Sequence, residues 1–213
     1  MRVAVFGGTG TAGAGALEAC LAEPQVERVL AFTRRPLPLA DPRLEPVHVD
    51  DFLHLGPVED AFDGLDAVLW CLGVSANKVR KEDDYRRITE TFTLVAAHVL
   101  ARRSPTAVFH FLSGQATNPR SRFMWARVKG DAELALRALD PPLGGVVCWR
   151  PGYIHPREPG AVMRAIYPAF RLIPGASVRA TELGRAMVRA TLDGLREGTL
   201  ENRAIRRLAA AAP

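Results

Sequence analysis

The strongest constraint on the fold is a glycine-rich turn that follows the first apolar stretch of the chain. Residues 2–6 are typical of a strand, residues 7–13 read GGTGTAG, and residues 14–21 favour a helix. The glycines satisfy both G-x-G-x-x-G and G-x-x-G-x-x-G. These patterns allow the backbone to approach a pyrophosphate closely, and they place the N-terminus of the following helix opposite its charge. A plain glycine-rich turn is the alternative. The context predicts a dinucleotide site, with these candidate binding residues: Gly7, Thr9, Gly10, Thr11, Ala12 and Gly13.

Strand-like and helix-like segments alternate along most of the chain. Further strands are expected at residues 27–33, 44–49, 66–71, 107–112 and 145–149. The longest intervening helix carries an apolar stripe of Tyr85, Ile88, Phe92, Val95 and Val99. After residue 149 the strand signal fades, and helices are expected at 161–172, at 181–195 and at the Ala/Arg-rich end, whose last residues we expect to be disordered. This alternation predicts an α/β fold in which residues 1–213 form a single doubly wound parallel-sheet Rossmann domain, with a small substrate-side segment at about 151–213.

Composition narrows the class of protein. The chain has 213 residues, of which 48% are hydrophobic, enough for one domain with a sizeable core. The net charge is +5, but the arginines are scattered, so we expect no nucleic-acid partner. We also expect no membrane helix, because no stretch approaches about 18 consecutive apolar residues, and no signal peptide. The three cysteines and five histidines lack metal or redox spacing, which favours a reduced, cytoplasmic protein.

The end of the second predicted strand indicates which dinucleotide is bound. NAD-binding Rossmann units usually carry an acidic residue there, whereas this chain has Thr33, Arg34 and Arg35. Guanidinium groups bind a 2′-phosphate that a carboxylate would repel, so we favour NADP(H) over NAD(H); solvated surface arginines are the alternative. Other candidate contacts are Asp50 or Asp51 near the adenine amino group, and Cys71, Leu72 and Gly73 passing over the ribose and phosphate.

Several stretches together resemble a known family. They are GGTGTAG, FTRRP, DAVLWCLG, FLSG, SRFMWARVKGDAE and WRPGYI. They are similar to the atypical short-chain dehydrogenase/reductases, over roughly residues 2–195, and within them to the Tat-interacting reductase-like group and its bacterial relatives. The resemblance implies NADP(H) binding, a seven-stranded or similar sheet, and an active site at the carboxyl ends of strands four to six. Related folds form homodimers through the helices that correspond to the striped helix and the helix of Trp125, so a homodimer is possible here. A monomer is equally compatible with the sequence.

The resemblance also implies a catalytic set, and one member is missing. Family chemistry uses a serine after strand five and a Tyr-x-x-x-Lys on the next helix, where the lysine lowers the phenol pKa and holds ribose hydroxyls. Ser113 stands at the serine position and Lys129 at the lysine position. The alternatives are that Ser113 only caps the end of the strand and that Lys129 is a solvated helix lysine. Position 125 is Trp125, whose indole N–H donates a hydrogen bond but cannot act as a proton-transfer acid near neutral pH.

Three interpretations follow from this substitution. In the first, the protein is a reductase of a small carbonyl or alcohol substrate, and Tyr153 or a water supplies the proton, although Tyr153 also suits plain aromatic packing. In the second, it binds NADP(H) without turnover as a redox sensor or regulatory module. In the third, it binds another nucleotide. The loop after strand six is expected to lie against the nicotinamide through Pro151 and Gly152, with Arg150 as a structural residue.

Overall fold

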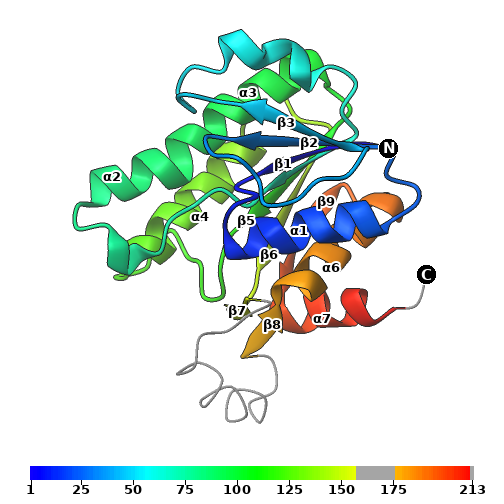
Figure 1. Cartoon of the computed structure of the whole chain (residues 1–213). Coiled ribbons are helices and arrows are strands. Elements are labelled where there is room, and N and C mark those ends of the chain that lie inside the picture. Colours follow the sequence, from blue (N-terminus) through cyan, green and yellow to red (C-terminus); the bar gives the residue numbers. More distant parts are fainter. Residues whose placement is uncertain (157–175, 212–213) are drawn as a thin grey trace.

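A single parallel sheet organises the chain. The computed structural model describes residues 1–156 and 176–211. Its seven-stranded sheet has the order β3-β2-β1-β4-β5-β6-β9, and every neighbouring pair is parallel (Figure 1). The strands are β1 (Arg2–Phe6), β2 (Arg28–Thr33), β3 (Leu44–His48), β4 (Ala67–Trp70), β5 (Val108–Leu112), β6 (Gly145–Arg150) and β9 (Glu197–Glu201). The predicted α/β class, the parallel sheet and its seven strands are confirmed.

Helices cover both faces of this sheet. One face carries α1 (Thr11–Ala22), α6 (Ala180–Leu192) and α7 (Asn202–Ala210); the other carries α2 (Glu82–Arg86), α3 (Phe92–Arg103) and α4 (Met124–Arg137) (Figure 1). Side chains alternate across a strand, so Ala4 and Phe6 join the core beneath α3 and α4, while Val3 and Val5 join the core beneath α1 and α6. The sheet is therefore buried on both sides, and its strand ends are the exposed positions available for a site.

The strand signal does not end at β6, and that expectation was wrong. Three more strands follow: β7 (Tyr153–His155), β8 (Ser177–Arg179) and β9. The first two form a small separate parallel sheet, and β9 pairs with β6 as an edge strand. β9 reads EGTLE and alternates between exposed and half-buried residues, so it lacks the apolar run of the buried strands. The expected helix at 161–172 and the last residues lie outside the described residues, whereas α6 and α7 match the other two expected helices.

The long helix that the sequence predicts does not keep one hydrogen-bond pattern along its whole length. α2 and α3 are joined by a π-helical turn, Arg87–Thr91, where the Thr93 hydroxyl donates to the Thr89 carbonyl (2.7 Å). The apolar stripe still faces inward, with Tyr85, Phe92 and Val99 buried. A 3-10 helix, Gly56–Phe62, precedes β4.

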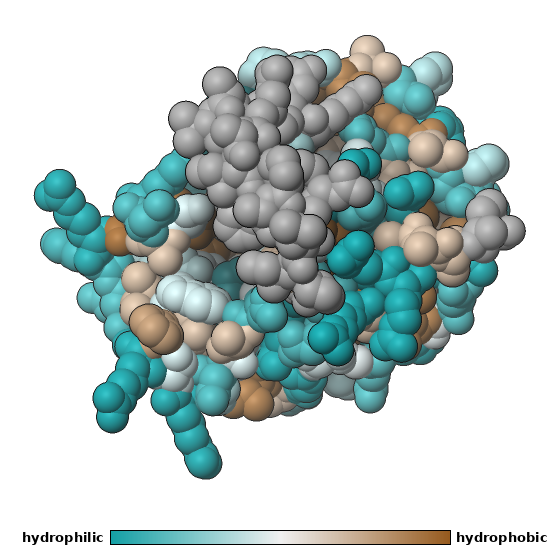
Figure 2. Space-filling view, turned by 90° about the horizontal axis from the view of Figure 1, so that it is seen from below, coloured by the Kyte–Doolittle hydropathy of each residue, from teal (hydrophilic) through white to brown (hydrophobic). Residues whose placement is uncertain are grey.

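On the face of the molecule that Figure 2 shows, hydrophilic residues predominate among the described residues, with hydrophobic residues between them. Within the described ranges, none of the helices combines the length and apolarity needed to cross a membrane. The same part of the chain holds no cluster of His, Cys, Asp or Glu suited to a metal ion.

A buried histidine links the sheet to α6. Trp149 Nε1 donates to His110 Nδ1 (3.1 Å), so His110 Nε2 carries the proton and donates to Thr191 Oγ1 (3.1 Å), which donates to the Met187 carbonyl (3.0 Å). His110 is fully buried, and burial lowers its pKa from 6.5 to about 3. This chain of hydrogen bonds requires a neutral imidazole.

We expect His110 to make the fold acid-sensitive. Because its pKa is lowered in the folded state, its contribution is complete above pH 6.5 and is lost as the pH falls from 6.5 toward 3. At about 1.4 kcal/mol per pH unit, the free energy of unfolding should fall by roughly 2.5 kcal/mol between pH 6.5 and 4.5 from this group alone. His110→Gln should be less stable at pH 7 but show a shallower decline, measured by urea unfolding at each pH. If the free energy of unfolding fell equally steeply with pH in wild type and in His110→Gln, this role of His110 would be contradicted.

Candidate functional site

The glycine turn brings three backbone segments into contact. Gly7 has a φ of 79°, and a Cβ placed on it would lie 2.7 Å from the Cys71 carbonyl oxygen after β4. A Cβ on Gly13, in the first turn of α1, would lie 2.1 Å from the Gly7 carbonyl oxygen. No side chain fits at either place, so α1 begins directly against the end of β1. This is the close approach that the sequence pattern predicts.

The start of α1 presents unused backbone donors. Gly10 is its N-cap and supplies no side-chain cap. The N–H groups of Thr11, Ala12 and Gly13 occupy the first helical turn, where the helix itself provides no acceptor. Together with the positive end of the helix dipole, they suit a pyrophosphate. The residues present therefore fit the phosphates of a dinucleotide.

A cleft opens beside this turn and collects most of the predicted cofactor residues. It is lined by Gly7, Thr9, Gly10, Phe32, Thr33, Arg34, Arg35, Phe52, Cys71, Leu72 and Gly73. Most of these residues come from the ends of β1, β2 and β4, which adjoin one another in the sheet, and Phe52 follows β3. Phe32 and Phe52 were not predicted, because the apolar pattern assigns both to the core. Ligands of open α/β sheets bind at such strand ends.

The two arginines after β2 lie at this cleft in an ordered turn. The Thr33 hydroxyl accepts from the Arg35 N–H (3.1 Å) and donates to the Arg35 carbonyl (2.7 Å). Arg35 Nη2 donates to Thr9 Oγ1 (3.1 Å), and the Arg34 guanidinium carbon lies 5.9 Å from the centre of the Phe52 ring. Neither arginine pairs with a carboxylate in the described part of the chain. Their charges are therefore available to an anion in the cleft.

The two aspartates after β3 are engaged with their own turn. Asp50 Oδ1 lies 3.0 Å from His48 Nε2. Asp51 accepts from the Leu53 N–H (2.9 Å) and contacts His54 Nδ1 (3.1 Å), and these bonds, the backbone one first, hold the pKa of Asp51 below its usual value. Neither side chain lines the cleft. Their contact with an adenine stays a prediction.

A second group of predicted residues meets at the end of β5. Lys129 on α4 donates from Nζ to the carbonyls of Leu112 (3.1 Å) and Ser113 (2.7 Å). A Cβ placed on Gly114 would lie 3.5 Å from Trp125 Cζ3 and 3.9 Å from Lys129 Cδ. Trp125 and Lys129 therefore share the helix face that covers the strand end, as their spacing of four predicts.

The ammonium of Lys129 is poised for a third partner. Burial lowers its pKa from 10.5 to about 8, while the charge of Glu133 acts in the opposite direction. Two of its three protons are donated to backbone carbonyls. The third has no acceptor within the described residues and is available to a ligand hydroxyl.

The loop after β6 is held by two hydrogen bonds from other parts of the chain. The Pro151 carbonyl accepts from the Gln115 N–H (2.9 Å), and the Gly152 N–H donates to Asn202 Oδ1 (2.9 Å). Tyr153 is 39% exposed and packs edge-on against His155, with ring centres 4.7 Å apart. This is the packing role named above as the alternative for Tyr153, and its service as an acid stays a prediction.

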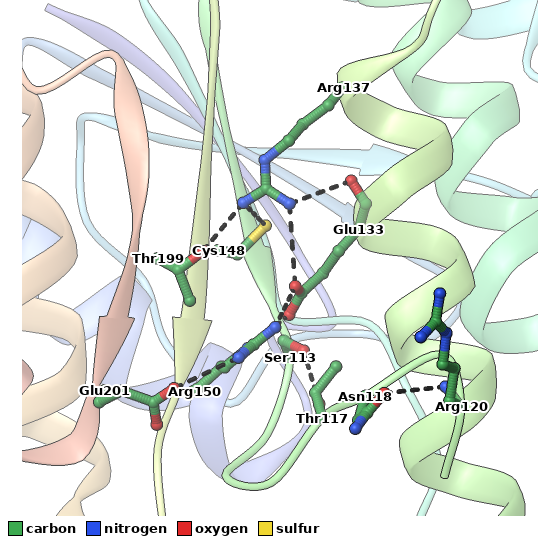
Figure 3. Close-up of polar contacts among 10 residues, drawn as sticks. All are labelled: Ser113, Thr117, Asn118, Arg120, Glu133, Arg137, Cys148, Arg150, Thr199 and Glu201. Atoms are coloured by element: carbon green, nitrogen blue, oxygen red, sulfur yellow. Dashed lines mark hydrogen bonds and ion pairs between the residues drawn. The ribbon is translucent and has the colours of Figure 1, made fainter.

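Behind the strand ends lies a buried ion pair that the sequence did not predict. Arg150 Nε and Nη2 donate to the two carboxylate oxygens of Glu133 (3.0 and 2.6 Å), and Arg150 Nη1 also lies 3.3 Å from Glu201 (Figure 3). Arg137 lies on the other side of Glu133 and contacts Cys148 Sγ (3.3 Å) and Thr199 Oγ1 (2.9 Å). Arg150 thus joins α4, β6 and β9, which agrees with its predicted structural role.

Comparisons with known proteins agree with this arrangement. No protein-family model matches the chain. The rat protein HTATIP2 (Rattus norvegicus) is 28% identical over 139 residues, a match that covers 64% of this chain and 57% of that protein. This match agrees with the resemblance to the Tat-interacting reductase-like group that the sequence motifs indicate. The match spans less than two thirds of the length of the rat protein.

Solved structures share the fold. A short-chain dehydrogenase from Burkholderia cenocepacia J2315 in complex with NADP superposes with a TM-score of 0.69 at 19% identity, covering 98% of this chain and 92% of that chain. MoeE5 in complex with UDP-glucuronic acid and NAD gives 0.73 at 17% identity, covering 94% and 75%. At these identities the likeness establishes the architecture.

Proposed function

We propose that this chain is an NADP(H)-binding oxidoreductase that acts on a small carbonyl or alcohol substrate. The observation that carries the proposal is the single cleft shared by Gly7, Arg34 and Arg35. It joins a backbone cradle for a pyrophosphate to two guanidinium groups that form no ion pair within the described residues. Related folds occur in complex with NADP and with NAD, which supports a nicotinamide dinucleotide. Residues 1–213 would form one cofactor domain, with 151–213 on the substrate side.

The residues divide the work along the strand ends. The glycine turn and the start of α1 hold the pyrophosphate, and Arg34 and Arg35 hold the 2′-phosphate. The remaining proton of Lys129 holds a ribose hydroxyl, and the Ser113 hydroxyl orients the substrate oxygen. The nicotinamide, when bound, supplies or accepts the hydride.

Trp125 favours a second candidate function. By the family resemblance it replaces the usual acid, it lies over Gly114, and its indole cannot give up a proton near neutral pH. A chain that keeps the cofactor cleft without this acid suits a non-catalytic NADP(H)-binding sensor or regulatory module. In the catalytic case, Tyr153 or a bound water supplies the proton.

Cofactor binding tests the part that both functions share. Titration of the purified protein, followed by nucleotide fluorescence, should give tighter binding of NADPH than of NADH. Equal affinities, or a preference for NADH, would overturn the role of Arg34 and Arg35. Binding of neither would overturn both functions.

Turnover separates the two functions. Trp125→Tyr should raise kcat for NADPH oxidation by at least about tenfold, because a positioned general acid contributes roughly 10²–10⁴-fold. The assay uses a panel of aldehydes, ketones and quinones. Trp125→Phe is the matched control, since it removes the indole without adding a hydroxyl, and it should bring no gain.

The wild-type protein decides between a relocated acid and no acid. Wild-type turnover that Tyr153→Phe abolishes would place the acid at Tyr153. Turnover that survives in Tyr153→Phe would favour water. No wild-type turnover, together with turnover in Trp125→Tyr, would support the sensor instead of the enzyme.

A further inference from the structure

A second buried hydroxyl accompanies Ser113. Ser113 Oγ and Thr117 Oγ1 lie 3.0 Å apart, and the two residues are only 3% and 5% exposed. Figure 3 shows the two side chains pointing at each other across the turn after β5. Thr117 also faces the candidate site, because its Oγ1 lies 4.0 Å from the Cβ position of Gly114, the point that Trp125 and Lys129 approach.

The hydroxyls of Ser113 and Thr117 together have one proton that their shared hydrogen bond does not use. Each hydroxyl has one proton to donate, and the shared hydrogen bond uses one of the two. Neither hydroxyl has another hydrogen-bond partner within the described residues. A buried donor without an acceptor is costly, so the remaining proton calls for an oxygen brought by a ligand.

The backbone is bent to place Thr117 there. Ala116 has a φ of 64°, a left-handed conformation that residues with a Cβ rarely adopt. The Thr117 N–H donates to the Gly114 carbonyl (3.2 Å), which closes a tight turn. Backbone in such a conformation persists where surrounding structure holds it, and it occurs preferentially at functional sites.

We propose that Thr117 is a positioning residue that donates its hydroxyl proton to Ser113 Oγ and thereby directs the Ser113 proton at the substrate oxygen. This inference rests on the proposed oxidoreductase function. Thr117 suits the fixed partner because its β-branched side chain is stiff about χ1, whereas a serine side chain turns freely among rotamers. Ser113 itself is held by its N–H, which donates to the Trp149 carbonyl (2.8 Å).

The test is a double-mutant cycle on kcat for NADPH-dependent reduction of the carbonyl panel, in wild type or, where wild type is silent, in the Trp125→Tyr background. Thr117→Val should lower kcat about tenfold, the worth of one ordinary hydrogen bond, with KM and NADPH affinity changed less than about twofold. Thr117→Ser should keep most of the activity. Ser113→Ala should cost more, and adding Thr117→Val to it should cost nothing further, because Thr117 acts through Ser113.

Thr93→Val is the matched control. Thr93 is also fully buried and donates one hydrogen bond, to the Thr89 carbonyl, but it lies in α3 away from the site. It should leave kcat unchanged. Should Thr117→Val fail to fold, Thr117→Ala takes its place in the cycle.

The outcomes are distinguishable. Turnover with unchanged kcat in Thr117→Val, or full additivity with Ser113→Ala, would overturn the positioning role and leave the oxidoreductase function intact. Loss of NADPH binding in Thr117→Val would show that Thr117 has a merely structural role, and this result would also overturn the positioning role. Absence of wild-type turnover on the whole panel would overturn the oxidoreductase function, and absence of turnover in Trp125→Tyr as well would overturn this inference with it.

Discussion

Replacing Glu133 with alanine is expected to lower the free energy of unfolding by about 3 kcal/mol, since removing one partner of a buried ion pair typically costs about 3–5 kcal/mol. Glu133 is 3% exposed and holds Arg150 through two hydrogen bonds. Its loss leaves the Arg150 guanidinium among α4, β6 and β9 with Glu201 as its one remaining ion-pair partner in the described part of the chain. Because Arg150 keeps that exposed partner, we place the cost at the lower end of the range.

Glu201→Ala is the matched control for this prediction. It removes the other carboxylate from the same arginine, but the Glu201 side chain is 55% exposed, and exposed ion pairs contribute about 0–1 kcal/mol. Urea unfolding followed by circular dichroism measures both variants, and a shift of about 6–12 °C in Tm should accompany the Glu133 loss in a chain of this size. A cost below about 1 kcal/mol for Glu133→Ala, or equal costs at both positions, would contradict the assignment.

Local chemistry explains what the sequence predicted well. The strand, glycine turn and helix at residues 2–21 depend on neighbours in the chain, so the close contact of Gly13 with Gly7 follows from spacing alone. The same holds for Trp125 and Lys129, which share a helix face four residues apart. The carboxyl ends of parallel strands meet at one edge, which explains why residues after β1, β2 and β4 share a cleft.

Features that depend on tertiary contact were not predicted. Glu133 and Arg150 carry no local signal of their pairing, because α4 must first pack against β6. β9 is an edge strand with alternating exposure, and its five residues lack the apolar run by which buried strands are recognised. Thr117 meets Ser113 only because Ala116 adopts a left-handed conformation, which glycine, and not alanine, would have indicated.

The structure also separates the two ends of the candidate site. The proposed cofactor end rests on backbone shape and on the charges of Arg34 and Arg35, whereas the proposed catalytic end rests on hydroxyls and on the partly buried Lys129 beside Trp125. A substitution of Arg34 or Arg35 should therefore leave the group around Trp125 unaffected. This independence makes nucleotide affinity a measurement that needs no knowledge of the substrate.

The double variant Arg34→Ala/Arg35→Ala is expected to raise the Kd for NADPH about 100-fold or more, while the Kd for NADH changes less than about threefold. A hydrogen bond to a charged group contributes about 1.5–3 kcal/mol, so two guanidinium groups on one phosphate account for a loss of this size. Both arginines line the cleft, and only NADPH carries the 2′-phosphate. Fluorescence titration at about 0.1 M salt measures both constants, because lower salt would exaggerate the effect of distant charges.

The control must remove the same net charge elsewhere. Arg203 and Arg206 are exposed on α7, which covers the sheet together with α1 and α6 and contributes no residue to the cleft. Arg203→Ala/Arg206→Ala should leave both affinities within about twofold, since neither arginine lines the cleft and salt screens exposed charges. An equal loss of NADPH and NADH in the Arg34/Arg35 variant would assign these arginines to the fold of the cleft. A matching NADPH loss in the α7 variant would assign the preference to overall charge, and either result would remove the structural basis for NADP(H) over NAD(H).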